Sequence, residues 1–170
     1  MRKKRVEGEE YAPREPKTKS AAEALSALMR LCSRAEKSSG DALRLMYRWG
    51  VPVSERQGVL AKLIEMRFID DARYAEAYTR EKSEISGWGV RKIAQNLYQK
   101  GVSKDIVSRT LAMIEGDDQR DMLEKKLRRK LSSTKASSDY ELRGKLLRYA
   151  LSQGYDYDMS IDVIDLITKD

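Results

Sequence analysis

The sequence predicts an all-α fold in which three tandem three-helix repeats form an elongated, curved array. Apolar residues recur at steps of three and four along most of the chain, which is the spacing of one helix face. No segment alternates apolar and polar residues over the length of a strand. A pattern of helix, glycine, short turn and second helix occurs three times, at Gly50, Gly101 and Gly154.

The three glycines lie 51 and 53 residues apart and set the register of the repeats. The positions −4, +1, +10 and +13 from each glycine are apolar in all three copies. A glycine just after a helix adopts the left-handed conformation at low cost, and the next apolar residue packs on the last turn. Position +2 holds a residue type that begins the next helix, namely Pro52, Ser103 or Asp156. Each repeat is therefore a small unit that must stack on its neighbours to bury enough surface.

A charged segment precedes the repeats. Residues 1–19 hold two of the three prolines and little apolar content, so a flexible basic tail is expected. The helical periodicity begins near Ser20, which has Glu23 at the spacing of a capping box. The rest of the chain is expected to divide into repeats at residues 20–66, 67–117 and 118–170.

Each repeat opens with a helix that precedes the glycine-containing pair. These first helices are expected at about residues 21–37, 71–85 and 118–132. In repeat 2, Asp70 is the expected N-cap, and Asp71 in the first turn is favoured by the helix dipole. Paired aspartates also suggest a Mg²⁺ site or acid–base chemistry, but no second acidic cluster with metal-binding spacing supports that alternative.

Composition excludes several kinds of chemistry. The 170 residues contain no histidine and a single cysteine, Cys32. The chain therefore has no imidazole for catalysis or metal binding, no intramolecular disulfide and no cysteine-based zinc site. No apolar run approaches the length of a membrane span, and no apolar stretch follows the basic first residues as in a secretory signal. We expect a cytoplasmic protein without a cofactor.

Basic residues are concentrated late in the chain. The net charge is +7, but residues 120–148 hold ten basic and four acidic side chains, whereas residues 149–170 hold one and five. The densest run lies on a predicted helix, where Lys125, Arg128 and Arg129 point away from the leucines. These cations repel one another unless an anion is nearby, so the run indicates contact with an anionic partner. A solvated helix face is the alternative.

A second cationic group is predicted around the Gly87-Trp88-Gly89 turn of repeat 2. Trp88 is either an exposed contact residue or a wedge between repeats. A cationic ridge for phosphates or for an acidic protein is expected from Arg80, Lys82, Arg91, Lys92 and Lys100. The alternative is a solvated face on which Lys and Arg complement the helix dipole.

Two segments of repeat 2 resemble the hallmark of the RecX family. They read Phe68-Ile69-Asp70-Asp71-x-Arg73-Tyr74-Ala75 and Gly87-x-Gly89-x-x-Lys92-Ile93-x-x-x-Leu97-x-x-Lys100-Gly101-Val102. The resemblance implies a regulator that lodges in the groove of the RecA recombinase filament. Such a regulator modulates, usually by inhibition, strand exchange, ATP hydrolysis and coprotease activity in homologous recombination, DNA repair and the SOS response. The first repeat departs from the pattern, with Trp49 where Lys100 stands in the second.

Three functional classes follow from these patterns. The first, which the resemblance implies, is a non-enzymatic, monomeric regulator of the RecA filament; an elongated stack of repeats also suits docking along a polymer. Such a protein would also bind single- or double-stranded DNA weakly. The second is an independent, sequence-nonspecific DNA-binding protein. The third is a Mg²⁺-dependent enzyme that would use Asp70 and Asp71.

Overall fold

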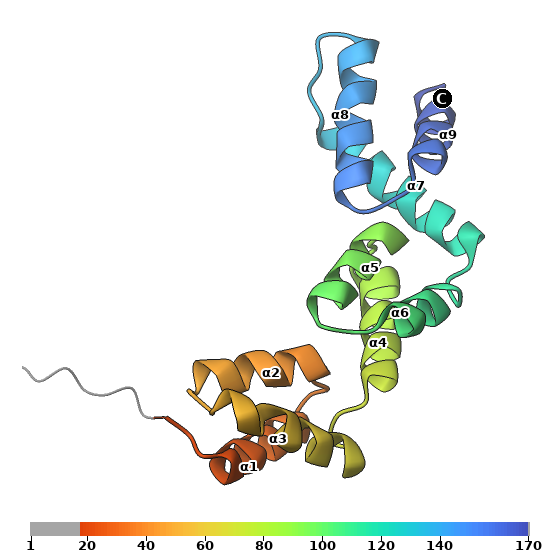
Figure 1. Ribbon diagram of the computed structural model, residues 1–170. Coiled ribbons are helices and arrows are strands. Elements are labelled where there is room, and N and C mark those ends of the chain that lie inside the picture. Colours follow the sequence, from red (N-terminus) through yellow and green to blue (C-terminus); the bar gives the residue numbers. More distant parts are fainter. Residues whose placement is uncertain (1–17, 170) are drawn as a thin grey trace, which may run out of the picture.

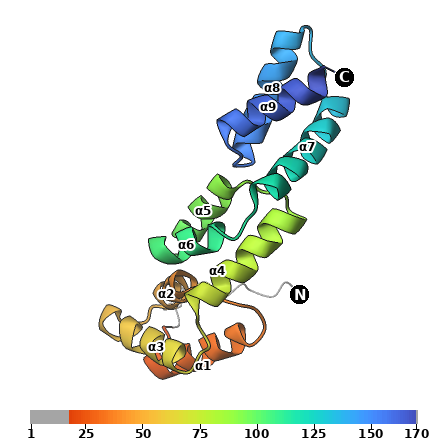
Figure 2. The same cartoon turned by 90° about the vertical axis from the view of Figure 1, so that its right-hand side faces the viewer.

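The computed structural model describes residues 18–169, which form helices and contain no strand. Figures 1 and 2 show three helical bundles that follow one another in an elongated array. The first holds α1 (Ala21–Cys32), α2 (Ser39–Arg48) and α3 (Val53–Glu65). The second holds α4 (Asp71–Arg80), the π-helix η1 (Glu81–Ile85), α5 (Val90–Gln99) and α6 (Lys104–Leu111). The third holds α7 (Gly116–Ser133), α8 (Asp139–Ser152) and α9 (Tyr157–Thr168).

This arrangement confirms the all-α prediction and the tandem three-helix organisation. Residues 1–17 of the expected tail lie outside the described residues. Its last two residues, Thr18 and Lys19, contact the first bundle, where the Lys19 amide donates to the Trp49 carbonyl at 2.8 Å.

Local hydrogen bonds fix the helix starts that the sequence predicts. The Ser20 hydroxyl accepts from the Glu23 amide at 3.3 Å, and the Glu23 carboxylate accepts from the Ser20 amide at 2.8 Å. This is the predicted capping box. The glycine-following helices α3, α6 and α9 begin, as predicted, at Pro52, Ser103 and Asp156, and of these three only Asp156 accepts a side-chain cap hydrogen bond, from the Asp158 amide.

Two first helices differ from the expected boundaries. Helix α1 ends at Cys32 rather than near residue 37, because the Ser33 hydroxyl donates to the Arg30 carbonyl at 2.9 Å and the chain then turns toward Ser38, the N-cap of α2. The helix expected at 71–85 is α-helical only to Arg80. The following five residues form a π-helix, which closes with the Ser86 amide donating to the Glu81 carbonyl at 3.1 Å.

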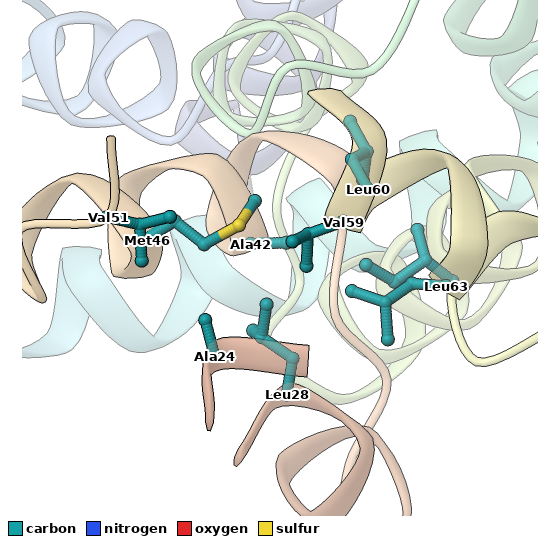
Figure 3. Close-up of a cluster of buried hydrophobic side chains, with 9 residues drawn as sticks. Ala24, Leu28, Ala42, Met46, Val51, Val59, Leu60 and Leu63 are labelled. Carbon is teal, nitrogen blue, oxygen red and sulfur yellow. The ribbon is translucent and has the colours of Figure 1, made fainter. Parts of the chain in front are cut away.

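Each bundle encloses its own apolar core. Figure 3 shows the first, where Leu28 of α1, Met46 of α2 and Leu63 of α3 converge. The residues at −4 and +1 from each repeat glycine are buried in all three bundles. Those at +10 and +13 are buried in the first and third, whereas Leu111 and Ile114 of the second are only partly buried. The reason is that α6 has 8 residues, against 13 in α3 and 12 in α9.

Backbone contact between glycines joins the first bundle to the second. The amino end of α2 meets the carboxyl end of α5, where the Ser38 hydroxyl donates to the Lys100 carbonyl at 2.6 Å. A Cβ on Gly40 would lie 2.3 Å from that same carbonyl oxygen. Because no side chain fits there, glycine allows the two helix ends to touch.

The second and third bundles are joined in the same way, through the amino end of α5 and the carboxyl end of α8. The Gly89 amide donates to the Gln153 carbonyl at 2.9 Å, and the Arg91 amide donates to the Gly154 carbonyl at 3.1 Å. A Cβ on Gly89 would lie 2.3 Å from the carbonyl carbon and oxygen of Gly154. The middle helices α2, α5 and α8 thus follow one another end to end (Figure 1).

Asp41 is the ionic element of the first joint. Its carboxylate accepts from Arg44 at 2.6 Å and from the Lys100 ammonium at 3.1 Å. Burial alone would raise the pKa of Asp41, but the hydrogen bonds from Arg44 and Lys100 outweigh burial and lower it. A lowered folded-state pKa stabilises the fold above the ordinary value of 3.8, and this stabilisation is lost as the pH falls through the folded-state value.

We therefore expect Asp41→Asn to lower the free energy of unfolding at pH 7 by about 1 kcal/mol. The variant should also lose less stability than the parent between pH 4 and pH 2. Urea unfolding at several pH values, followed by circular dichroism, measures both quantities. Parallel pH curves for the two proteins would contradict the role of Asp41.

Candidate functional site

Trp88 carries two lysine ammonium groups over its indole ring. The Nζ atom of Lys82 lies 5.2 Å and that of Lys92 lies 4.4 Å from the ring centroid, both within cation–π range. The ring also packs against the core of the second bundle and is partly exposed. Trp88 thus packs within the second bundle rather than between bundles, and its partly exposed ring holds two cations, of which Lys82 also pairs with Glu81 at 2.7 Å. Its role as a contact residue stays a prediction.

The turn that places Trp88 is built from backbone groups. Gly87 has a φ of 60°, the left-handed region that favours glycine, and the Trp88 amide donates to the Lys82 carbonyl at 2.8 Å. From the third bundle, the hydroxyl of buried Tyr155 donates to the Gly87 carbonyl at 3.0 Å. Burial raises the pKa of Tyr155 to about 12, so this hydroxyl stays protonated as a donor.

Lys126 of α7 holds the same turn and was not among the predicted contact residues. Its ammonium donates to the carbonyls of Ser86 at 2.8 Å and Gly87 at 2.7 Å, and to the Gln153 side chain at 3.0 Å. Burial, followed by the nearby Lys92 and Arg129 charges, lowers the pKa of Lys126. Its inward orientation could have been predicted from its position three residues after Leu123, which places it on the same side of the helix.

Two of the predicted contact residues form ion pairs across the joints between bundles. Arg91 pairs with Asp156 of the third bundle at 2.5 Å, and Lys100 pairs with Asp41 of the first bundle at 3.1 Å. The structure therefore gives Arg91 and Lys100 a role in joining bundles. Lys82 and Lys92 are the predicted cations that it brings together at Trp88.

The remaining predicted cations lie elsewhere. Arg80 and Lys125 line a hollow of about 490 Å³ between α4, η1, α6 and α7, which four carboxylates also line. Those carboxylates belong to Glu76, Glu84, Asp118 and Asp121. Arg128 pairs with Glu124 at 2.8 Å, while Arg129 is exposed on the outer face of α7.

A basic basin between α7 and α8 was not predicted. This hollow of about 470 Å³ is lined by four cations, the three hydroxyls of Ser133, Thr134 and Ser152, and Tyr149; the cations are Lys130, Lys135, Lys145 and Arg148. The Lys130 Nζ atom lies 5.5 Å from the centroid of the Tyr149 ring. Lys145 pairs with Glu141 at 2.6 Å, whereas no ion pair within residues 18–169 involves Lys130, Lys135 or Arg148.

Lys126 and Lys130 of α7 link the Trp88 turn to the basin. Lys126 of α7 binds the Trp88 turn and Gln153 of the third bundle. One turn later on α7, Lys130 lies over Tyr149, and Tyr149 precedes Gln153 by one turn. Like charges gathered in this way raise the local potential and attract anions. We call the two Trp88 cations, Lys126 and the cations of the basin together the cationic face.

Asp70 and Asp71 are both engaged by backbone amides. Asp70 accepts from the Ala72 and Arg73 amides at 3.0 and 3.1 Å, as the predicted N-cap of α4. Asp71 accepts from the Ser39 amide at 2.8 Å and so contributes to the first joint. In the described part of the chain, no three Cys, Asp or Glu side chains come together as metal ligands. Helix capping and the joint between bundles therefore explain why two aspartates stand side by side here.

Comparison with known proteins identifies the family. Residues 70–111 match the profile of the second three-helix domain of RecX, and residues 117–164 match that of the third. Regulatory protein RecX of Mycobacterium sp. (strain KMS) is 31% identical over 139 residues, which cover 79% of this chain and 75% of that relative. The chain belongs to the RecX family.

Other RecX proteins agree with this assignment. Regulatory protein RecX of Clostridium botulinum (strain Eklund 17B / Type B) is 36% identical over 104 residues, but the match covers 60% of this chain and only 48% of that relative. A crystal structure of regulatory protein RecX superposes with a TM-score of 0.74 at 22% identity, over 85% of this chain and 71% of the other. RecX from Lactobacillus salivarius gives 0.71 at 22% identity, over 88% and 97%. The solved structures confirm the fold.

The RecX relatives are named as regulatory proteins, which supports a regulatory role for this chain. Within residues 18–169, none of the helices combines the length and the apolar character that crossing a bilayer requires.

Proposed function

We propose that this RecX-family chain binds the RecA recombinase filament in the cytoplasm and inhibits its ATP hydrolysis, strand exchange and coprotease activity. The observation that carries the proposal is the cationic face, which crosses the joint between the second and third bundles. A filament of recombinase on DNA is a long polyanion with a repeating protein surface, and an elongated protein contacts such a polymer at several points.

Binding alone accounts for such regulation. A protein that bridges neighbouring subunits, or blocks the addition of the next one, changes the filament without forming or breaking a covalent bond. Electrostatic attraction to the cationic face raises the rate of encounter and orients the chain. No step requires a catalytic group.

The test is ATP hydrolysis by RecA on single-stranded DNA at increasing concentrations of this chain. We expect the parent to slow hydrolysis. Lys82→Gln combined with Lys92→Gln, which removes both charges over Trp88, should require a roughly tenfold higher concentration for half of the effect. The charge-matched control is Arg48→Gln with Lys62→Gln, two exposed cations of the first bundle. If the parent leaves hydrolysis unchanged, the proposal is wrong.

A second candidate function is sequence-nonspecific DNA binding without the recombinase, and the basic basin favours it. Three of its cations lack a carboxylate partner in the described part of the chain, and they border a hollow open to solvent. The Ser133 and Ser152 hydroxyls already donate to backbone carbonyls, at 3.1 and 2.7 Å. Recognition therefore falls to the charged groups, which attract phosphates without reading bases.

We expect Lys130→Gln with Arg148→Gln to lower the salt slope of binding to single-stranded DNA by about 1.4. The reason is that each phosphate contact releases counterions from the DNA, so a variant that makes two fewer contacts releases fewer counterions on binding. Fluorescence anisotropy of a labelled oligonucleotide between low and moderate salt gives the slope. The first-bundle double variant Arg48→Gln with Lys62→Gln removes the same charge and should leave the slope near that of the parent. Equal salt slopes for the two double variants would show that the basin does not contact DNA.

A further inference from the structure

The carbonyl that ends each middle helix accepts a hydrogen bond from an earlier part of the chain. The Lys100 carbonyl at the end of α5 accepts from Ser38, and the Gln153 carbonyl at the end of α8 accepts from Gly89. Both donors belong to the amino end of the preceding bundle's middle helix. The carboxyl end of a middle helix, with its glycine, is therefore a socket for the end of another helix.

The first bundle has the same socket, and within residues 18–169 no earlier bundle fills it. The socket consists of the Trp49 carbonyl and Gly50, whose φ of 67° matches the left-handed glycines of the other two. Residues 18 and 19 occupy it. The Lys19 amide donates to the Trp49 carbonyl at 2.8 Å, and the Thr18 Cγ2 atom lies 2.8 Å from where a Cβ on Gly50 would stand. The Lys19 ammonium lies 5.4 Å from the centroid of the Trp49 ring.

The opposite end of the array carries a helix end that meets no such socket among the described residues. Helix α8 begins at the N-cap Ser138, as α2 begins at Ser38, and each N-cap hydroxyl accepts from the amide three residues on. The second helical residue is Gly40 in α2 but Tyr140 in α8, and Tyr140 is 90% exposed. Because even a Cβ would clash at Gly40 in its joint, a tyrosine at this place prevents the same approach.

From these contacts we propose that Thr18 and Lys19 at one end, and Tyr140 at the other, keep a second copy of this chain from docking head to tail. The socket at Gly50 and the amino end of α8 are the two halves of a joint that the molecule uses twice internally. A heterologous contact of this kind does not close on itself and would extend into open chains of molecules. Blocking both halves keeps an elongated array at a fixed length, in the way that end units close other repeat proteins.

This inference goes beyond the proposed function, and its test contains neither recombinase nor DNA. The opened variant combines Thr18→Gly, Lys19→Pro and Tyr140→Gly. Proline removes the amide that binds the Trp49 carbonyl, and the glycine at 140 restores the small residue found in α2. Sedimentation or light scattering then gives the average molar mass over a range of concentrations, and circular dichroism verifies that the helices remain.

We expect the parent to keep the mass of one chain, and the opened variant to rise about twofold in average mass as the concentration approaches ~1 mM. Lys19→Ala retains the backbone amide and is the matched control, which should remain a single chain. Two results would overturn the proposal: a folded opened variant that stays a single chain at the highest concentration, or head-to-tail association of the parent itself.

Discussion

Replacing Gly154 with alanine is expected to lower the free energy of unfolding by about 3 kcal/mol or more. The φ of Gly154 is 89°, which L-residues with a side chain rarely adopt. An added Cβ would also lie 2.4 Å from the backbone nitrogen of Lys92 and 2.3 Å from its Cβ. Since one of these neighbours is backbone at the start of α5, relief requires the second and third bundles to separate.

Chemical denaturation of the full chain measures this loss, with Trp88 fluorescence in a Trp49→Phe background as a probe next to the joint. Gly58→Ala is the matched control, because Gly58 is exposed inside α3 and an added Cβ would meet nothing within 4 Å. Alanine there should raise stability by up to about 1 kcal/mol, as in any exposed helix interior. If both substitutions changed the free energy of unfolding equally, the close approach at the joint would not be what makes Gly154 necessary.

Lys126→Met is expected to cost about 2 kcal/mol and to loosen the Trp88 turn. Methionine keeps most of the side-chain volume but leaves the Ser86 and Gly87 carbonyls without the ammonium that binds both. The Gly87 carbonyl keeps only the bond from Tyr155 among the side-chain donors of the described residues. The consequence is a less fixed Trp88, and therefore a less ordered pair of cations over its ring.

Hydrogen exchange of the backbone around residues 86–92 and acrylamide quenching of Trp88 in the Trp49→Phe background report this loosening. Lys125→Met is the control on the adjacent residue, whose exposed side chain lines the hollow on the other side of α7. That variant should leave both the quenching and the stability near the parent values. If the two methionine variants behave alike, Lys126 acts only through its charge.

The repeat pattern predicted the architecture because it follows from local rules. A glycine after a helix and a capping residue two positions later act within a few residues of chain, as they do at Gly101 and Ser103. The Ser20–Glu23 capping box and the Asp70 N-cap were predictable for the same reason. The end of α1 and the π-helix η1 were missed, because serine hydroxyls there bond to nearby carbonyls and interrupt an otherwise helical pattern.

For the cationic residues, the sequence predicted which side chains are exposed but not what they contact. A helical wheel separates Lys125, Arg128 and Arg129 from the apolar side of α7, and all three are exposed as expected. The wheel does not show what an exposed cation meets. Arg128 pairs with a carboxylate on its own helix, and Lys125 lines a hollow that four carboxylates also line.

By itself, the sequence determined that the chain is helical, that it is built three times from one glycine-ended unit, and that its family is RecX. These properties depend on residue spacing, which is read along one dimension. Only the tertiary structure decided that Arg91 and Lys100 join bundles, that Lys126 turns inward, and that a basin forms between α7 and α8. The physical reason is that charge pairing and close backbone approach act between residues 32 to 65 positions apart, at distances that the packing of the bundles alone sets.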